Sequence, residues 1–279
     1  MFRLFVFSLL GLLLVSTVSC QLHRSFAPIS PSQYLGSEQS RQGIAALEQG
    51  NLTEAERRLE HAVKLSKNDI NHRQHYAEVL WQQGKHQEAL AQLNEAVKRG
   101  GQNNASLYIS LAEKYLAIQE YTTAYRYADE AVRLDSQNYQ SWALRGSTKR
   151  LQAIHQSGYA EHTATMLRQS REDYLRAVSL APSNRELLTE LAWVQTSCGQ
   201  PEQALATWLT VQSLYSQGSE PAEVLVGKME TLAVLRRFDE AEANVAALRQ
   251  RGLDHSKAGQ RLQAMIVAAQ ETNGPSRNR

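Results

Sequence analysis

Few residues of this chain have the type and spacing to do chemistry. His72 and His75 lie three residues apart on one face of an expected helix, and His61 and His86 are close in sequence. Imidazole nitrogens at that spacing can ligate zinc, but no cysteine or carboxylate is placed to complete a ligand set. We therefore expect neither a metal site nor a cofactor.

Glu78, Glu113 and Arg150 are the charged residues that could act on a glycan if this chain were an enzyme. The sequence has no Gly-rich phosphate loop, no Gly-x-Ser-x-Gly and no His-Glu-x-x-His motif. Nothing therefore specifies a nucleophile, a phosphate site or a catalytic metal. We predict no catalytic residues, and a glycan-acting enzyme is the least favoured alternative.

The first twenty residues form a segment of a different kind. Arg3 supplies a positive charge, residues 4–15 are almost entirely apolar, and small and polar residues follow. These are the three parts of a secretory signal, and the apolar run is short for a helix that must cross ~30 Å of hydrocarbon. We therefore expect export.

Ser19, Cys20 and Gln21 close this segment, and Cys20 could carry a lipid. The stretch resembles a bacterial lipoprotein processing site, in which a small residue precedes the lipidated cysteine, although Thr17 stands where that family usually has leucine. The resemblance implies a membrane anchor at Cys20, and Gln21 in place of an aspartate favours the outer membrane. A plain cleaved signal, giving a periplasmic or secreted protein, and a retained signal anchor remain alternatives.

Composition favours an ordered, helix-rich chain. Of 279 residues, 42% are hydrophobic and 21% charged, with 15 glycines and 6 prolines. The net charge is +2, and the basic residues alternate with glutamates, so we predict no nucleic-acid partner. Cys198 is the second of two cysteines, so stability must come from packing, and we expect Cys198 to be a small buried side chain.

An internal repeat organises most of the chain. A glycine, an alanine, an apolar residue and a small residue recur in that order, and the first two copies are 34 residues apart at every position. The copies are Gly50-Ala55-Leu59-Ala62, Gly84-Ala89-Leu93-Ala96, Ala124-Ala128-Ala131, Gly199-Ala204-Trp208-Val211 and Ala241-Val245-Leu248. In the third and the last copy, Gln119 and Arg236 occupy the glycine position.

Upstream of each turn a small residue recurs at one position of the first helix. These residues are Gly43, Ala77, Ala112, Gly146 and Ala192. Together with the turn glycine, the alanine of the second helix and the terminal proline at Pro182, this period resembles the tetratricopeptide repeat. The resemblance implies an all-α fold, a right-handed superhelical solenoid of antiparallel helix pairs.

The repeat frame divides the chain into segments. We predict a signal segment at 1–20, a polar spacer at 21–35, a repeat array at 36–270 and a disordered tail at 271–279. The array holds six repeats, at 36–69, 70–103, 105–138, 139–184, 185–218 and 222–255, and a capping helix at 256–270. The fourth repeat exceeds the period, and its extra residues around 152–166 predict an extended helix pair or a longer turn.

The first helix of each repeat is expected to line a concave groove that binds a partner. The predicted groove residues are Ile44, Leu47, Gln74, Glu78, Trp81, Ile109, Glu113, Leu116, Arg150, Trp193 and Glu230. Trp81 and Trp193 fall outside the buried stripe and are candidate anchors for a bound peptide, unless each packs against a neighbouring helix.

We predict a non-enzymatic scaffold or adaptor at the cell envelope, with a protein or peptide as its partner. The alternative role is an accessory subunit of an envelope-assembly or polysaccharide-export complex, and the signal segment alone supports it.

Overall fold

The computed structural model describes residues 30–155, 160–216, 218–253 and 256–272. Within these ranges the chain forms 13 helices, one short 3₁₀ turn and no strand, which confirms the all-α prediction. The helices group into two compact units, an N-terminal module that ends at Gly100 and a C-terminal module that begins at Gly101.

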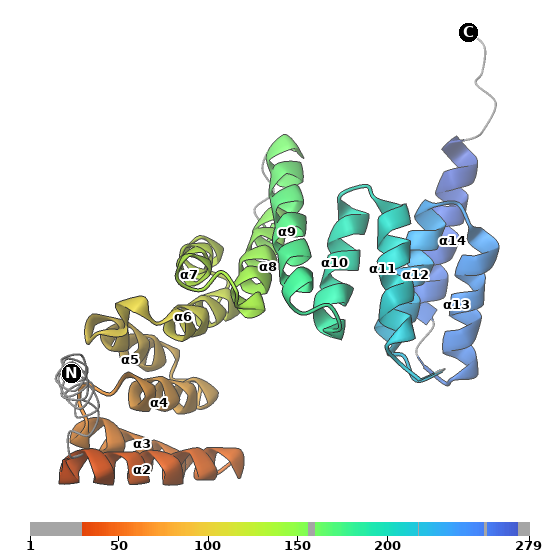
Figure 1. Ribbon diagram of the computed structural model, residues 1–279. Helices are drawn as coiled ribbons and strands as arrows, with labels where there is room; N and C mark the ends of the chain where they lie inside the picture. The colour runs from red at the N-terminus through yellow and green to blue at the C-terminus, as the bar shows by residue number, and fades with distance from the viewer. Residues whose placement is uncertain (1–29, 156–159, 217, 254–255, 273–279) are drawn as a thin grey trace, which may run out of the picture. The chain divides into compact units, whose positions relative to one another are not determined.

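The N-terminal module contains two helix pairs. They are α2 (Pro31–Glu48) with α3 (Leu52–Leu65), and α4 (Ile70–Gln82) with α5 (His86–Lys98) (Figure 1). Helix α3 also packs against α4, and the two first helices, α2 and α4, contact each other. Helices α2, α3 and α4 therefore each pack against more than one neighbour.

Helix α2 begins at Pro31, so the prediction that residues 31–35 belong to a polar spacer is wrong. Ser30 and Gln33 form a capping box: the Ser30 hydroxyl accepts a hydrogen bond from the Gln33 N–H at 3.2 Å, and Gln33 Oε1 accepts one from the Ser30 N–H at 3.0 Å. Proline suits the first helical position because its fixed φ is helical and it has no N–H to leave unpaired. Pro31 therefore starts a helix.

The C-terminal module contains four helix pairs and a final helix. The pairs are α6 (Ala105–Ala117) with α7 (Tyr121–Leu134), α8 (Tyr139–His155) with α9 (Ala160–Leu180), α10 (Arg185–Ser197) with α11 (Pro201–Ser213), and α12 (Ala222–Val234) with α13 (Phe238–Gln250). A 3₁₀ turn, Gly101–Asn103, opens the module, and α14 (Ser256–Thr272) packs against α12 and α13 at its end.

The recurring alanine and leucine positions form the core of the helix pairs. Spacings of three and four place each triplet on one side of a second helix, where it meets the first helix of the pair. All five predicted triplets are buried, none more than 8% exposed: Ala55-Leu59-Ala62, Ala89-Leu93-Ala96, Ala124-Ala128-Ala131, Ala204-Trp208-Val211 and Ala241-Val245-Leu248.

The glycine position adopts a left-handed backbone in all five of these turns. The φ angles are +74° at Gly50, +78° at Gly84, +64° at Gln119, +72° at Gly199 and +60° at Arg236. In each turn this residue donates its N–H to the carbonyl three residues back, and the next residue donates to the carbonyl five back. The period therefore determines the backbone conformation even where the residue is not glycine.

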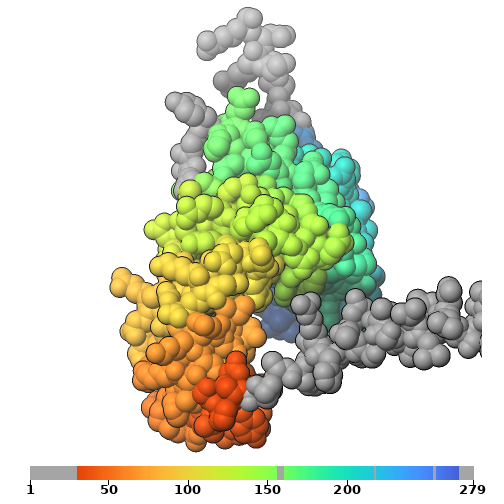
Figure 2. Space-filling view, turned by 60° about the vertical axis from the view of Figure 1, so that its left-hand side comes forward, coloured from red at the N-terminus to blue at the C-terminus, as the bar shows by residue number. Residues whose placement is uncertain are grey.

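The extra length of the fourth repeat lies in its two helices, α8 with 17 residues and α9 with 21, on either side of residues 156–159, which lie outside the described ranges. Figure 2 shows α8 and α9, yellow-green to green, packed side by side. Gly146 permits this approach, because a Cβ there would lie 3.2 Å from Tyr174 Cδ2. The hydroxyl of Ser170 also donates to the Gly146 carbonyl at 2.7 Å.

Candidate binding surface

The eleven predicted groove residues all lie on first helices of the pairs. Ile44 and Leu47 are on α2, and Gln74, Glu78 and Trp81 are on α4, all in the N-terminal module. Ile109, Glu113 and Leu116 are on α6, Arg150 on α8, Trp193 on α10 and Glu230 on α12, all in the C-terminal module. We call the exposed side of these helices the first-helix surface of each module.

In the N-terminal module, the predicted residues make contacts of their own. Leu47 packs against the core cluster that includes Ala46 and Leu59. The ring of Trp81 stacks on His86 at the start of α5, with 4.2 Å between the ring centroids. Trp81 therefore packs against a neighbouring helix, which is the alternative to a free anchor.

On α6 the predicted residues differ in accessibility. Ile109 is 9% exposed, so the prediction that it lines an open surface is wrong. Helix α6 contacts both α7 and α8, so more than one side of it is buried. Ile109 lies outside the stripe that the repeat pattern predicts to be buried, but it is covered all the same. Glu113 is exposed and Leu116 is half-buried, so both are accessible on this helix.

Three other predicted residues link successive first helices of the C-terminal module. Arg150 on α8 pairs with Glu190 on α10, with 2.9 Å between Nη2 and Oε2. Trp193 Nε1 on α10 donates to Glu223 on α12 at 3.3 Å, and Glu230 on α12 pairs with Arg261 on α14 at 2.7 Å. We call these three contacts the polar ladder.

The ladder changes the interpretation of its members. Trp193 also makes an edge-on contact with the buried Trp208, with 5.2 Å between ring centroids, so it is held on two sides. The side chains of Arg150, Trp193 and Glu230 hold neighbouring repeats together, and a partner would meet them already engaged.

The sequence did not predict a buried ionic cluster between α7, α8 and α9. The carboxylate of Asp173, 3% exposed, accepts hydrogen bonds from Arg145 Nη2 at 2.7 Å and Lys149 Nζ at 2.9 Å. Arg145 also pairs with Asp129 on α7 at 2.6 Å and lies over the ring of Trp142. The cluster is internally neutralised, which indicates a structural role.

The histidine pair shows no metal-binding geometry. His72 is buried and lies 3.7 Å from Asp69, while burial lowers the pKa of His75. No group of three or more His, Cys, Asp or Glu side chains able to hold a metal occurs in the described residues. Cys198, at the end of α10, is partly buried, and its burial raises the pKa of the thiol, which disfavours the reactive thiolate.

The predicted signal segment and Cys20 lie outside the described residues. Among the helices that the structure describes, none is both long and apolar enough to cross a membrane.

Residues 46–115 match the tetratricopeptide repeat family model, over the segment where the turns and buried triplets have the geometry given above. These residues are tetratricopeptide repeats, and the likeness to solved structures shows the tetratricopeptide fold for the chain. The comparison with curated protein sequences gives no match.

Solved structures share this tetratricopeptide fold over most of their own length. PilF of Pseudomonas aeruginosa has 16% identity and a TM-score of 0.68, covering 84% of this chain and 99% of that one. PilW, described as a widely conserved type IV pilus biogenesis factor, has 15% identity and a TM-score of 0.66, covering 83% and 98%. YrrB, described as having an unusual peptide-binding site, has 17% identity and a TM-score of 0.58, covering 74% and 97%.

Identities this low show the fold alone. In all, 326 chains of solved structures match, so the tetratricopeptide fold does not by itself select one function.

Proposed function

We propose that this protein is a non-catalytic interaction scaffold whose first-helix surface binds a protein or peptide. The observation that carries the proposal is the repeat array itself, in which each first helix keeps a side that its own second helix does not cover. The half-buried leucines Leu47 and Leu116 and the half-buried rings of Trp81 and Trp193 lie on these helices. The fold likeness to YrrB, described as having a peptide-binding site, supports a peptide partner.

Within the C-terminal module, α6 is the strongest candidate for direct contact. Its Glu113 is exposed, and Leu116 lies one turn further along, so a charged and an apolar side chain share one stripe. Arg150, Trp193 and Glu230 are engaged in the polar ladder. We therefore expect a partner to contact the half-buried apolar side chain of Leu116 on α6.

Site-specific photo-cross-linking tests this surface. A photoreactive amino acid in place of Leu116 should cross-link, in the native cells, to one defined protein. The matched control is Thr122, which is exposed on α7, the second helix of the same pair. Equal cross-linking from both positions, or none from Leu116, would contradict binding at the first-helix surface.

The finer proposal is that the protein works at the cell envelope, anchored through a lipid on Cys20. Two observations favour it over other locations: the apolar segment that ends at Cys20, and the fold likeness to PilW, described as a pilus biogenesis factor. An accessory subunit of an envelope-assembly or polysaccharide-export complex is the second candidate function. Metabolic labelling with a fatty acid should mark the protein, and Cys20→Ala should abolish the label; label that survives this change would exclude the anchor.

A glycan-acting enzyme stays the alternative from another class. Arg150, one of its three candidate residues, is paired with Glu190, and Glu78 accepts a hydrogen bond from Gln82 at 3.0 Å. Turnover of cell-wall glycans by the purified protein, lost in Glu113→Gln, would contradict the scaffold proposal.

A further inference from the structure

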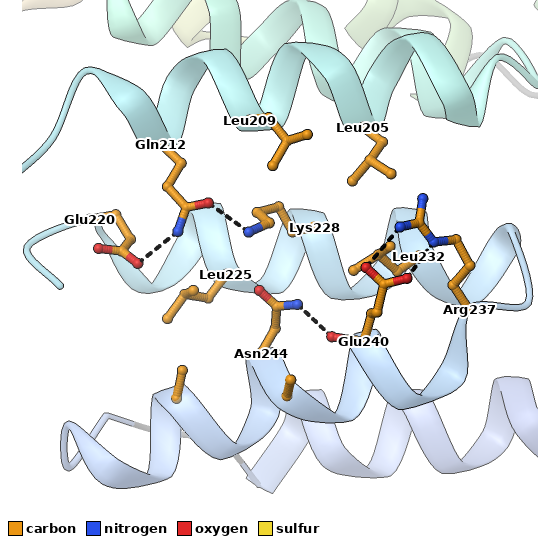
Figure 3. Close-up of a pocket in the computed structure, with 12 residues that line it drawn as sticks. Leu205, Leu209, Gln212, Glu220, Leu225, Lys228, Leu232, Arg237, Glu240 and Asn244 are labelled. Carbon is orange, nitrogen blue, oxygen red and sulfur yellow. Dashed lines mark hydrogen bonds and ion pairs between the residues drawn. The ribbon is translucent and has the colours of Figure 1, made fainter. Parts of the chain in front are cut away.

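A groove lies between the second helices of the last two repeats, on the side away from the first-helix surface. Its volume is about 330 Å³, within the range of ligand sites in proteins. Helices α11 and α13 form its walls and α12 its floor (Figure 3). The apolar lining comes from Leu205, Leu209, Leu225, Leu232, Ala243 and Ala247.

The groove is open because its two walls differ in side-chain size. Leu209 on α11 is 51% exposed, although leucine is a residue that helices usually bury. The facing wall on α13 presents the short side chains of Ala243 and Ala247, which leave space in front of the leucines. An aliphatic side chain placed there would cover Leu209 and gain its own burial.

Lys228 lies in the middle of this groove, on the floor helix, with its ammonium directed to Gln212 on the α11 wall (Figure 3). Its Nζ donates to Gln212 Oε1 at 2.6 Å, and Gln212 Nε2 in turn donates to Glu220 at 3.2 Å. Among the described residues, Lys228 has no carboxylate within ion-pair distance. Burial lowers the pKa of its ammonium, and the negative charges of Glu220 and Glu240 offset this only in part.

The two carboxylates of the groove are engaged elsewhere. The carboxylate of Glu240 accepts hydrogen bonds from Nε and Nη2 of Arg237, at 2.6 and 2.7 Å. The buried Glu220 accepts from Gln212 and lies 3.9 Å from Arg251, whose Nη2 also donates to the Glu220 carbonyl.

Comparison with the fourth repeat shows what Lys228 lacks. Lys228 is the seventh residue of α12, and Arg145 is the seventh residue of α8. Arg145 has two carboxylate partners, Asp173 and Asp129, at 2.7 and 2.6 Å. The same repeat position therefore carries a cation paired with two carboxylates in one repeat and a cation with no carboxylate within ion-pair distance in the other.

We propose that this groove is a second binding site, which takes a segment of a partner protein in which aliphatic side chains flank an aspartate or glutamate. The aliphatic side chains lie against the leucines and alanines of the walls, and the acidic side chain supplies the counter-charge for Lys228. This goes beyond the proposed function, because the walls of the groove are second helices and none of the eleven predicted groove residues lines it.

Selection from a displayed library of random nine-residue peptides, with the purified full chain as target, tests the composition of the ligand. We expect enrichment of Asp or Glu with Leu, Ile or Val within two residues. An enriched peptide is then synthesised with a fluorophore, and its Kd is measured by fluorescence anisotropy. Failure to enrich any peptide, or enrichment without acidic residues, overturns the proposal.

The variants locate the binding. Lys228→Met keeps the apolar stem and removes the charge, so the Kd should rise about tenfold or more, as for loss of a charge-assisted hydrogen bond. The matched control is Lys257→Met, at an exposed lysine of α14 in the same module, and it should leave the Kd unchanged. Circular dichroism confirms that both variants fold.

Two further measurements separate the charge from the cavity. Replacing the peptide's acidic residue by its amide should weaken binding to the wild-type chain but not to Lys228→Met, as a double-mutant cycle requires for a direct contact. Ala247→Phe should fill part of the groove and abolish binding. Equal affinity of Lys228→Met and wild type, or undiminished binding to Ala247→Phe, overturns the proposal. The Leu116 cross-link reports on the other surface, so the two proposals fail separately.

Discussion

Gln119 occupies a turn position where three of the other four repeat turns have glycine, and it holds a φ of +64°. For a residue with a Cβ, this left-handed conformation costs about 1–2 kcal/mol of strain. Glycine avoids the strain but loses more conformational entropy on folding, which costs about 0.5–1 kcal/mol. Gln119→Gly should therefore raise the free energy of unfolding by about 0.5–1 kcal/mol.

Gly84→Ala tests the same backbone energy with the opposite sign. Gly84 has a φ of +78°, and a Cβ there would meet no heavy atom within 4 Å, so the substitution adds strain without a clash. We expect it to lower the free energy of unfolding by about 0.5–1 kcal/mol, the mirror image of the gain at Gln119.

Urea unfolding of the full chain, followed by circular dichroism, measures both changes. Gln119→Ala is the control, because it shortens the side chain but keeps the Cβ, and it should change stability by less than about 0.5 kcal/mol. If Gln119→Ala stabilised as much as Gln119→Gly, side-chain contacts and not the backbone would be responsible. If Gly84→Ala left the free energy of unfolding unchanged, the turn would have to relieve the strain by relaxing, and the backbone argument would be refuted.

Three further substitutions test the packing and the charges. Gly227→Ala should destabilise by about 2–3 kcal/mol in urea unfolding, because its Cβ would lie 2.1 Å from the ring of Trp208; Gly259→Ala, whose Cβ would meet its nearest neighbour at 3.8 Å, is the control and should not destabilise. Asp173→Asn should cost about 3 kcal/mol, since Arg145 and Lys149 would keep buried charges without a carboxylate, and Asp129→Asn, at a 51% exposed partner of Arg145, should cost less. Burial lowers the pKa of His75 from 6.5, so the unfolded chain binds its proton more readily; stability should fall as the pH drops below about 6.5, and His75→Gln should reduce this fall between pH 7 and 5.5.

The period predicted the parts of the fold that every repeat shares. It located the buried triplets, and it placed Gln119 and Arg236 in the turn position, where both adopt the left-handed backbone that glycine adopts elsewhere. A frame shared by several copies therefore outweighs the preference of one residue type. The same frame failed at Ile109, because a stripe pattern describes burial against one neighbour and α6 has two.

The contacts of the first-helix surface could not be predicted in the same way. A contact encoded by the repeat would recur with the same residue types in successive copies, but Trp193 meets Glu223 whereas Glu230 meets Arg261. The polar ladder depends on how each pair of repeats is rotated and on which long side chains reach across. Such contacts belong to individual interfaces and leave no periodic signal.

The seventh residue of the first helix shows how a repeat array acquires sites that its period does not encode. In α6 and α10 this residue is Leu111 or Leu191, buried in the core as the pattern expects. In α8 it is Arg145, and two carboxylates from neighbouring helices neutralise it within the fold. In α12 it is Lys228, and the carboxylate that the neighbouring α13 brings to the groove, Glu240, is paired with Arg237. A cation that replaces a core leucine is costly without a counter-charge. The fourth repeat supplies this counter-charge from its own neighbouring helices, and in the sixth repeat we propose that a ligand supplies it. Departures from the period, more than the period itself, therefore indicate where partners bind.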